Sequence, residues 1–233
     1  FQEVKNGFGN RLRALLDSRK DDTDEAKERK SERKTIYSER GKELGKYQKN
    51  LKKAENGLLS IIRPYLEAEP IYTEFLMPIR GCAERMSACL ITSIIDIKRF
   101  PTVSKLWAYS GLHVIDGKAA HRRKGEKANW NGFLKTKLFV LAECLIRQNT
   151  DPETDKPLRY RKLYDDYKHR VVNRAACHLT KEEHAKSKDA AVTWLPNGCT
   201  KGHANNMAIR YLQKMFLQDL WLKWYELDGV EPP

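Results

Sequence analysis

Residues 81–97 have the sequence GCAERMSACLITSIIDI. Apolar side chains recur at helical intervals in this stretch, at Met86, Leu90, Ile94 and Ile97. That spacing places them on one face of an α-helix, and a glycine at position 81 suits the tight turn that must precede the helix. We therefore predict a helix from Gly81 to about Ile97, with Trp107–Leu112 packed beneath it.

The turn at Gly81 followed by an apolar helix is similar to half of a helix-hairpin-helix unit. In such units, backbone N–H groups at the start of the helix approach a DNA phosphate, helped by the positive end of the helix dipole. An ordinary core helix after a glycine turn has the same pattern. Both interpretations stay open on this stretch alone.

A helical arm is predicted upstream. From Arg19 to Lys34 nearly every residue is charged and the signs alternate, which is typical of a solvated helix with ion pairs four residues apart. The apolar positions that follow, spaced 3-4-3-4-3-4, are Leu44, Tyr47, Leu51, Ala54, Leu58, Ile61 and Tyr65. Such a seam predicts a coiled coil or a long antiparallel hairpin, ended or distorted at Pro64.

We expect one face of this arm, with Leu44, Leu51, Leu58 and Tyr65, to be buried against another helix of the chain or of a partner. A second apolar face begins at Phe8, so two helices folded back on each other and one long rod both fit the pattern. A plain spacer or dimerising arm is also compatible, because heptads specify packing and not chemistry.

The C-terminal third also has a helical pattern. Residues 151–157 have turn chemistry, and helices are expected at about Leu158–Cys177 and His203–Leu227. The last helix aligns one apolar stripe, formed by Ile209, Leu212, Phe216, Leu220, Trp224 and Leu227. We predict a mainly α protein in three parts. These are a helical, coiled-coil arm at 1–70, a compact helical domain with the helix-hairpin-helix-like segment at 71–150, and a helical extension packing on it at 151–233.

Composition favours a polyanionic partner. Forty-four Lys and Arg residues stand against 31 Asp and Glu, a net charge of +13 with a pI near 9.5, which is typical of proteins that bind nucleic acid. No run of about 18 apolar residues occurs, so no membrane partner is expected. The five cysteines are odd in number and fit reduced thiols in a cytosol better than a disulfide framework.

Much of the positive charge gathers between Lys98 and Lys137, where ten basic residues against Asp116 and Glu126 leave a net +8. Cations there would neutralise phosphates, and the indole of Trp130 offers a face for base stacking. The candidate nucleic-acid contacts are Lys98, Arg99, Lys105, Lys118, His121, Arg122, Arg123, Lys124, Lys127 and Trp130. The alternative is an exposed solubilising loop with Trp130 in the core.

Side chains of the types that bind zinc occur late in the chain, at Cys177, His178, His184, Cys199 and His203. Their spacing contains neither a C-x2-C nor an H-x3-H pair, and a tetrahedral site needs four converging ligands. We therefore predict no metal site and no cofactor in this sequence.

Two stretches together resemble a known family. Residues 96–112, DIKRFPTVSKLWAYSGL, follow the predicted helix, and residues 200–210, TKGHANNMAIR, open the predicted last helix, which continues through WLKW at 221–224. These stretches resemble the DEDD-type insertion-sequence transposases, which are related to DNA invertases and known as bridge-RNA-guided recombinases. The resemblance covers about Phe8 to Tyr225, and its most specific part is Gly81 to Leu112.

The resemblance implies a large protein with an N-terminal RNase H-like domain, a coiled-coil arm and a C-terminal transposase domain that contacts DNA. Four acidic metal ligands would lie in the N-terminal domain, which this sequence lacks, so Mg²⁺ is expected only with that domain. In the family the nucleophile is the serine of a Ser-Gly pair after Y-x-G-L. Asp116-Gly117 is the nearest equivalent here, and Ser110 and Ser104 are the nearby hydroxyls. We name no catalytic residue and expect this segment alone to be inactive.

The function expected from the resemblance is that of the C-terminal part of a DNA transposase. It would bind DNA, with or without a guide RNA, in a bacterial or archaeal cytoplasm, as a homo-oligomer through the coiled-coil arm. Two alternatives remain, a non-catalytic nucleic-acid-binding or architectural protein derived from a transposase, and a protein–protein adaptor built on the arm.

Overall fold

The computed structural model describes residues 24–115, 118–120, 125, 127–173 and 200–232. It divides the chain into two units, one ending at Ile61 and the other beginning at Ile62. In the described part, helices dominate, and the only strands are the two short ones of a hairpin. The predicted mainly α fold is confirmed. The boundaries predicted at residues 70 and 150 stay predictions.

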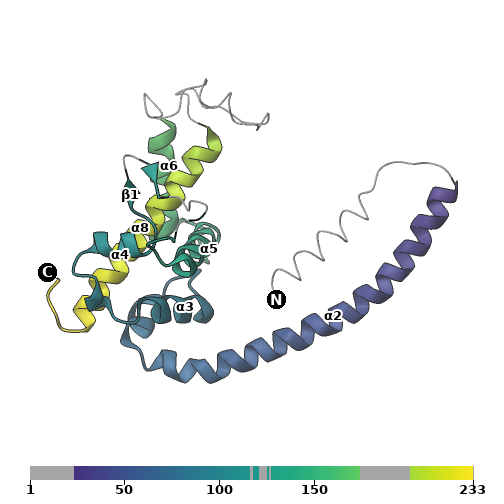
Figure 1. Cartoon of the computed structure of the whole chain (residues 1–233), viewed down its shortest axis with the longest axis horizontal. Helices are drawn as coiled ribbons and strands as arrows, with labels where there is room; N and C mark the ends of the chain where they lie inside the picture. Colours follow the sequence, from purple (N-terminus) through teal and green to yellow (C-terminus); the bar gives the residue numbers. More distant parts are fainter. Residues whose placement is uncertain (1–23, 116–117, 121–124, 126, 174–199, 233) are drawn as a thin grey trace. The chain divides into compact units, whose positions relative to one another are not determined.

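Helix α2 (Asp24–Glu67) is drawn as one continuous helix in Figure 1. It runs through Pro64 and ends three residues later, so the proline does not end it at once. The Pro64 carbonyl still accepts a backbone bond from Ala68 N–H at 3.2 Å. Proline lacks an N–H, and the helix loses only one bond at that position.

Of the predicted buried face of α2, Leu58 and Tyr65 are exposed in the structure and Leu51 is partly buried. Tyr47, Leu58, Ile61 and Tyr65 are 65%, 61%, 64% and 74% exposed. The side chain of Leu44 and the upstream face beginning at Phe8 lie outside the described residues. Because no partner chain is present, burial of the seam in an assembly stays a prediction.

The helix predicted from residues 81–97 is present as α3 (Glu84–Ile94), and Gly81 takes a positive φ of +100° in the turn before it. It begins three residues later and ends three residues earlier than predicted. Ile95 adopts φ +67°, and a separate 3₁₀ turn, η2 (Ile97–Arg99), follows. The predicted inward residues Leu90, Ile94 and Ile97 are fully buried, and Met86 packs at the edge of the core.

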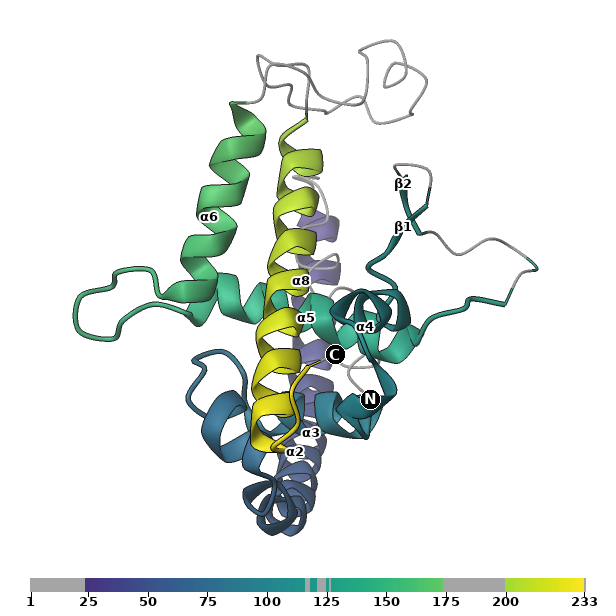
Figure 2. The same ribbon diagram turned by 90° about the vertical axis from the view of Figure 1, so that its left-hand side faces the viewer.

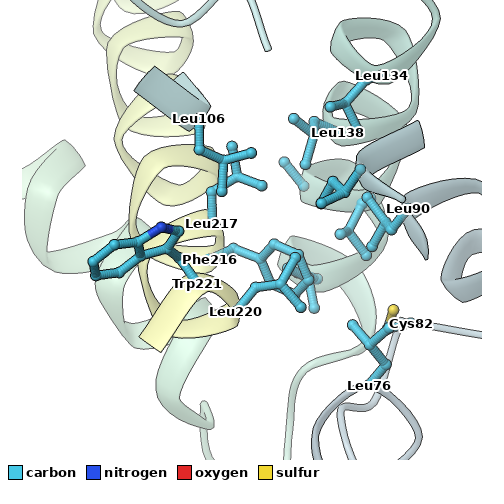
Figure 3. Packing of buried hydrophobic residues seen from close by; sticks show 14 of the residues in the cluster. Leu76, Cys82, Leu90, Leu106, Leu134, Leu138, Phe216, Leu217, Leu220 and Trp221 are labelled. Carbon is cyan, nitrogen blue, oxygen red and sulfur yellow. The ribbon is translucent and has the colours of Figure 1, made fainter. Parts of the chain in front are cut away.

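The core is built where α3 meets α4 (Val103–Tyr109), α5 (Gly132–Gln148) and α8 (Lys201–Leu227). Figure 3 shows side chains from all four helices meeting there. Those labelled include Leu90, Leu106, Leu134, Leu138, Phe216, Leu217 and Leu220. All seven are buried. The apolar stripes predicted on α3 and α8 therefore face each other across one core.

Helix α6 (Arg159–Val172) lies alongside α8, as Figure 2 shows. The loop before it has the predicted turn chemistry, with Asp151 Oδ1 accepting bonds from the N–H groups of Glu153 and Thr154. Arg159 binds the Asp219 carboxylate of α8 with two bonds of 2.9 Å, and the Tyr160 hydroxyl donates to the same carboxylate. Burial and the nearby Asp219 charge raise the pKa of Tyr160.

A polar linkage ties α3, α4 and α5 together at their ends. The Asn131 side chain begins α5 by accepting a bond from Leu134 N–H, and its amide donates to the Tyr109 hydroxyl at 3.0 Å. That hydroxyl donates to the Ser93 carbonyl of α3 at 3.1 Å. The start of α5 is thereby held beside α4 and the end of α3.

Between α4 and α5 the chain forms a small antiparallel hairpin, β1 (Val114–Ile115) with β2 (Lys118–Ala119). The hairpin lies close to α4, as Figure 2 shows. Among the described helices, none is both long enough and apolar enough to cross a membrane.

Neighbouring residues of α5 allow a test of this core. Leu138 is 1% exposed and Phe139 is 47% exposed. We expect Leu138→Ala to lower the free energy of unfolding by about 2–5 kcal/mol, because it leaves a cavity. Phe139→Ala should change it by less than about 1 kcal/mol. Urea denaturation of both variants checks this, and equal losses would show that α5 is packed with a different face inward.

Candidate nucleic-acid interface

Half of the predicted nucleic-acid contacts can be placed with their side chains. These are Lys98, Arg99, Lys105, Lys127 and Trp130. His121, Arg122, Arg123 and Lys124 lie outside the described residues, as does Asp116. For Lys118 only the backbone is described, in β2. The densest part of the predicted basic loop is therefore untested by the structure.

Two of the placed cations make contacts within the fold. Lys98 Nζ lies 3.2 Å from the Asp228 carboxylate. The Arg99 guanidinium donates to the Ile94 carbonyl at 2.9 Å and lies 5.5 Å from the ring centroids of both Phe100 and Tyr109. The same carbonyl, at the end of α3, also accepts the N–H of Asp96 at 2.8 Å. The Arg99 side chain thus stabilises the C-terminal end of α3.

Lys105 and Lys127 are exposed. Lys105 lies in the first turns of α4, and Lys127 lies between the hairpin and α5. Within the described part of the chain, neither ammonium group has an ion-pair or hydrogen-bond partner. Both are free to contact a polyanion.

Trp130 is half-buried and packs over the turn after α4. Gly111 has φ +68° there, and a Cβ at that position would come within 2.7 Å of Trp130 Cδ1 and 2.9 Å of Lys135 Cδ. The ring of His113 meets the indole edge-on at 5.9 Å, and Lys135 Nζ lies 4.7 Å from the indole centroid. Much of the Trp130 surface is therefore in contact with the protein, and base stacking by this residue stays a prediction.

Ser110 is fully buried, and its hydroxyl donates to the Leu106 carbonyl at 2.8 Å. A serine nucleophile needs access to the substrate and a base within hydrogen-bond distance. In this structure the Ser110 hydroxyl has a helix carbonyl as its partner instead. Ser104 is exposed on α4, and its hydroxyl makes no hydrogen bond to a base among the described side chains.

Three cations that the predicted set did not include lie near Trp130 or Trp107, namely Lys135 of α5 and Arg210 and Lys214 of α8. The Arg210 guanidinium donates to the His113 carbonyl at 2.6 Å, and Lys214 Nζ lies 4.8 Å from the Trp107 ring centroid. Burial and the charge of Arg210 lower the pKa of both lysines. One sequence signal could have found the α8 pair, since two cations four residues apart flank the apolar stripe of the last helix.

No metal site is formed by the residues that the structure describes, because nowhere among them do three His, Cys, Asp or Glu side chains gather. Of the predicted zinc-type donors, only His203 is described, and Cys177, His178, His184 and Cys199 lie outside. The three described cysteines, Cys82, Cys89 and Cys144, are free thiols.

Residues 73–158 match the model of the Transposase IS116/IS110/IS902 family. The matched segment begins in η1 (Tyr72–Leu76) and contains α3, α4, the hairpin and α5. It includes the specific part of the resemblance noted in the sequence, Gly81 to Leu112. The chain matches none of the curated proteins and none of the solved structures.

The approach of Trp130 to Gly111 generates a stability prediction. Gly111→Ala should lower the free energy of unfolding by about 1–3 kcal/mol, because alanine is strained at φ +68° and its methyl group would collide with the indole. Gly132→Ala is the matched control, since Gly132 lies in α5 with open space around it, and alanine there should raise stability by up to about 1 kcal/mol. Thermal denaturation checks both, and a Gly111→Ala variant as stable as the wild type would contradict the packing described.

Proposed function

We propose that the chain is the C-terminal region of an IS110-type transposase and binds DNA during transposition of an insertion sequence. The match of residues 73–158 to the Transposase IS116/IS110/IS902 family supports this proposal. The observation that carries the proposal is the family match together with the net +8 between Lys98 and Lys137, a stretch that runs through α4, the hairpin and the start of α5. The same phosphate chemistry would serve a guide RNA.

Free cations support this proposal. Lys105 and Lys127 are exposed without partners among the described side chains, and each can neutralise a phosphate and release a counterion. Arg122, Arg123 and Lys124 add three further cations within a short stretch of the sequence. Lys98 and Arg99 are weaker candidates, because each already has contacts within the fold.

The proposed role is binding rather than chemistry. Ser110 is buried with its proton directed to a helix carbonyl, and Asp116-Gly117 stands where the family has Ser-Gly. Strand transfer would then need the RNase H-like domain and its Mg²⁺ ions, which the resemblance places outside this sequence. A non-catalytic protein derived from a transposase is the alternative function, and Asp116 at the position nearest to the family's serine favours it.

Homo-oligomerisation through α2 is part of the proposal. The seam residues Tyr47, Leu58, Ile61 and Tyr65 are each more than 60% exposed in the single chain. Exposed large apolar side chains at heptad spacing are stabilised by pairing with another helix. Transposition brings two DNA ends together, which a dimer would do through its two basic surfaces.

The basic loop provides the test of DNA binding. Replacing Arg122, Arg123 and Lys124 by alanine should weaken duplex binding and flatten the log–log dependence of affinity on salt. The slope should change by about 0.9 for each phosphate that is no longer neutralised, and up to about three phosphates are involved. The control replaces Lys156, Lys162 and Lys201, which are exposed outside the predicted interface, and changes the net charge equally. Fluorescence anisotropy across a salt series measures both variants.

If the two triple variants show the same decrease in affinity and in slope, only net charge matters and the loop is not the interface. If neither differs from the wild type, the binding surface lies elsewhere, and the charged part of α2 becomes the region to test. Circular dichroism of each variant should show unchanged helix content.

A further inference from the structure

Lys135, Arg210 and Lys214, together with His113, Trp107 and Trp130, form what we call the tryptophan-framed cation cluster. It unites residues of α4, α5 and α8 with the segment that leads into β1. Lys135 and the α8 pair are distant in the sequence, so the cluster exists only because α5 and α8 pack together. It does not include the exposed lysines considered above, Lys105 and Lys127.

A chain of short contacts holds the three cations close together. Lys135 Nζ lies 4.7 Å from the Trp130 centroid, and the Trp130 ring lies 5.9 Å from the His113 ring. The His113 carbonyl accepts the bond from Arg210 at 2.6 Å. Lys214 is one helical turn beyond Arg210 on the same face of α8, with its Nζ 4.8 Å from the Trp107 centroid.

Among the residues that the structure describes, no carboxylate pairs with any of the three cations of the cluster. All three are half-buried, where each charge costs more than it would in water. Burial lowers the pKa of Arg210, and burial followed by the charge of Arg210 lowers the pKa of Lys135 and Lys214. Another lysine of α8, Lys223, shows the contrast, because it is paired with Glu226 and Glu74.

Unused hydrogen-bonding capacity accompanies the uncompensated charge. Lys135 donates one bond, to the Ala120 carbonyl at 3.2 Å, and Lys214 Nζ donates none within the described part of the chain. Each ammonium carries three N–H donors and each guanidinium five, so most donors of the cluster have no partner among the described residues. The buried His113 Nδ1 also has no hydrogen-bond partner among the described residues.

We propose that the tryptophan-framed cation cluster is a binding site for a nucleic-acid phosphodiester, with Lys135 and Lys214 as its direct contacts and Arg210 as the residue that completes its charge. The proposal rests on the proposed function and deepens it by naming the site. An anion there would offset mutual repulsion among three cations and accept the free N–H donors. Trp107 and Trp130 hold the lysine side chains over their ring faces, so their ammonium groups are positioned before the ligand arrives.

The test replaces Lys135 and Lys214 by glutamine, which keeps most of each side chain over its indole but removes the charge. The double variant should bind both duplex DNA and a hairpin RNA on the order of tenfold or more weakly at about 0.1 M salt. For duplex DNA, the slope of log affinity against log salt concentration should be flatter by the contribution of about two phosphate contacts. Its melting temperature without ligand should equal or exceed that of the wild type, because charge repulsion has been removed. A decrease on RNA alone or DNA alone would identify which nucleic acid supplies the phosphodiester.

The matched control is the double variant Arg147→Gln and Lys223→Gln. Arg147 lies on the same helix as Lys135 but outside the basic stretch, with its Nε donating to the Glu143 carbonyl at 3.1 Å, and Lys223 lies on the same helix as Lys214. The control removes the same charge from the same two helices outside the cluster. It should bind nucleic acid with nearly the affinity of the wild type.

A binding test with inorganic pyrophosphate distinguishes an error in the proposed site from an error in the proposed function. Pyrophosphate should raise the melting temperature of the wild type and of the control but not of the cluster variant. If the wild type binds nucleic acid and the cluster variant binds it equally well, the site is wrong while the function stands. If the wild type binds no nucleic acid, the function and the assigned ligand both fail, even where pyrophosphate still binds. A cluster variant with reduced helix content and a lower melting temperature would show that the lysines serve packing, which also overturns the proposal.

Discussion

Burial of the apolar stripe of α8 is the constraint on which the compact unit depends. Phe216, Leu217 and Leu220 lie in one core with side chains of the three helices from the matched segment (Figure 3). Two indole N–H groups add hydrogen bonds to this packing. The Trp221 indole donates to the Phe100 carbonyl at 2.8 Å, and the Trp107 indole donates to the Lys214 carbonyl at 3.0 Å. The hydrophobic effect brings α8 to its place, and these directional bonds set its register.

That register has an electrostatic consequence. Because α8 turns its stripe toward α4 and α5, the adjacent face carries Arg210 and Lys214 to the base of the hairpin, where Lys135 already lies. A partly buried group of like charges destabilises a free protein, and such groups are characteristic of functional sites. The stability that the hydrophobic core contributes thus offsets the destabilisation caused by grouping these three cations. Their proposed partner is an anion.

Much of the helical architecture was predictable from local pattern. The spacing of Leu90, Ile94 and Ile97 predicted α3, and the stripe from Ile209 to Leu227 predicted α8, because a period of 3.6 residues is a property of the chain itself. The early end of α3 was not predictable, since it depends on Ile95 taking a positive φ and on the Arg99 side chain reaching back to Ile94. Most of the predicted contacts in the basic loop, Arg122 to Lys124 among them, remain expectations.

The sequence by itself determined the helices, the excess of positive charge and the motif from Gly81 to Leu112 that resembles a transposase, because each is written in neighbouring residues. Only the tertiary structure decided which cations have partners. Lys98 meets Asp228, and Arg99 meets the end of α3, whereas Lys135, Arg210 and Lys214 meet one another without a described acid. A net charge calculated from the sequence treats all these residues alike. The free energy of each charged side chain, however, depends on its burial and on neighbours that packing brings from distant parts of the sequence.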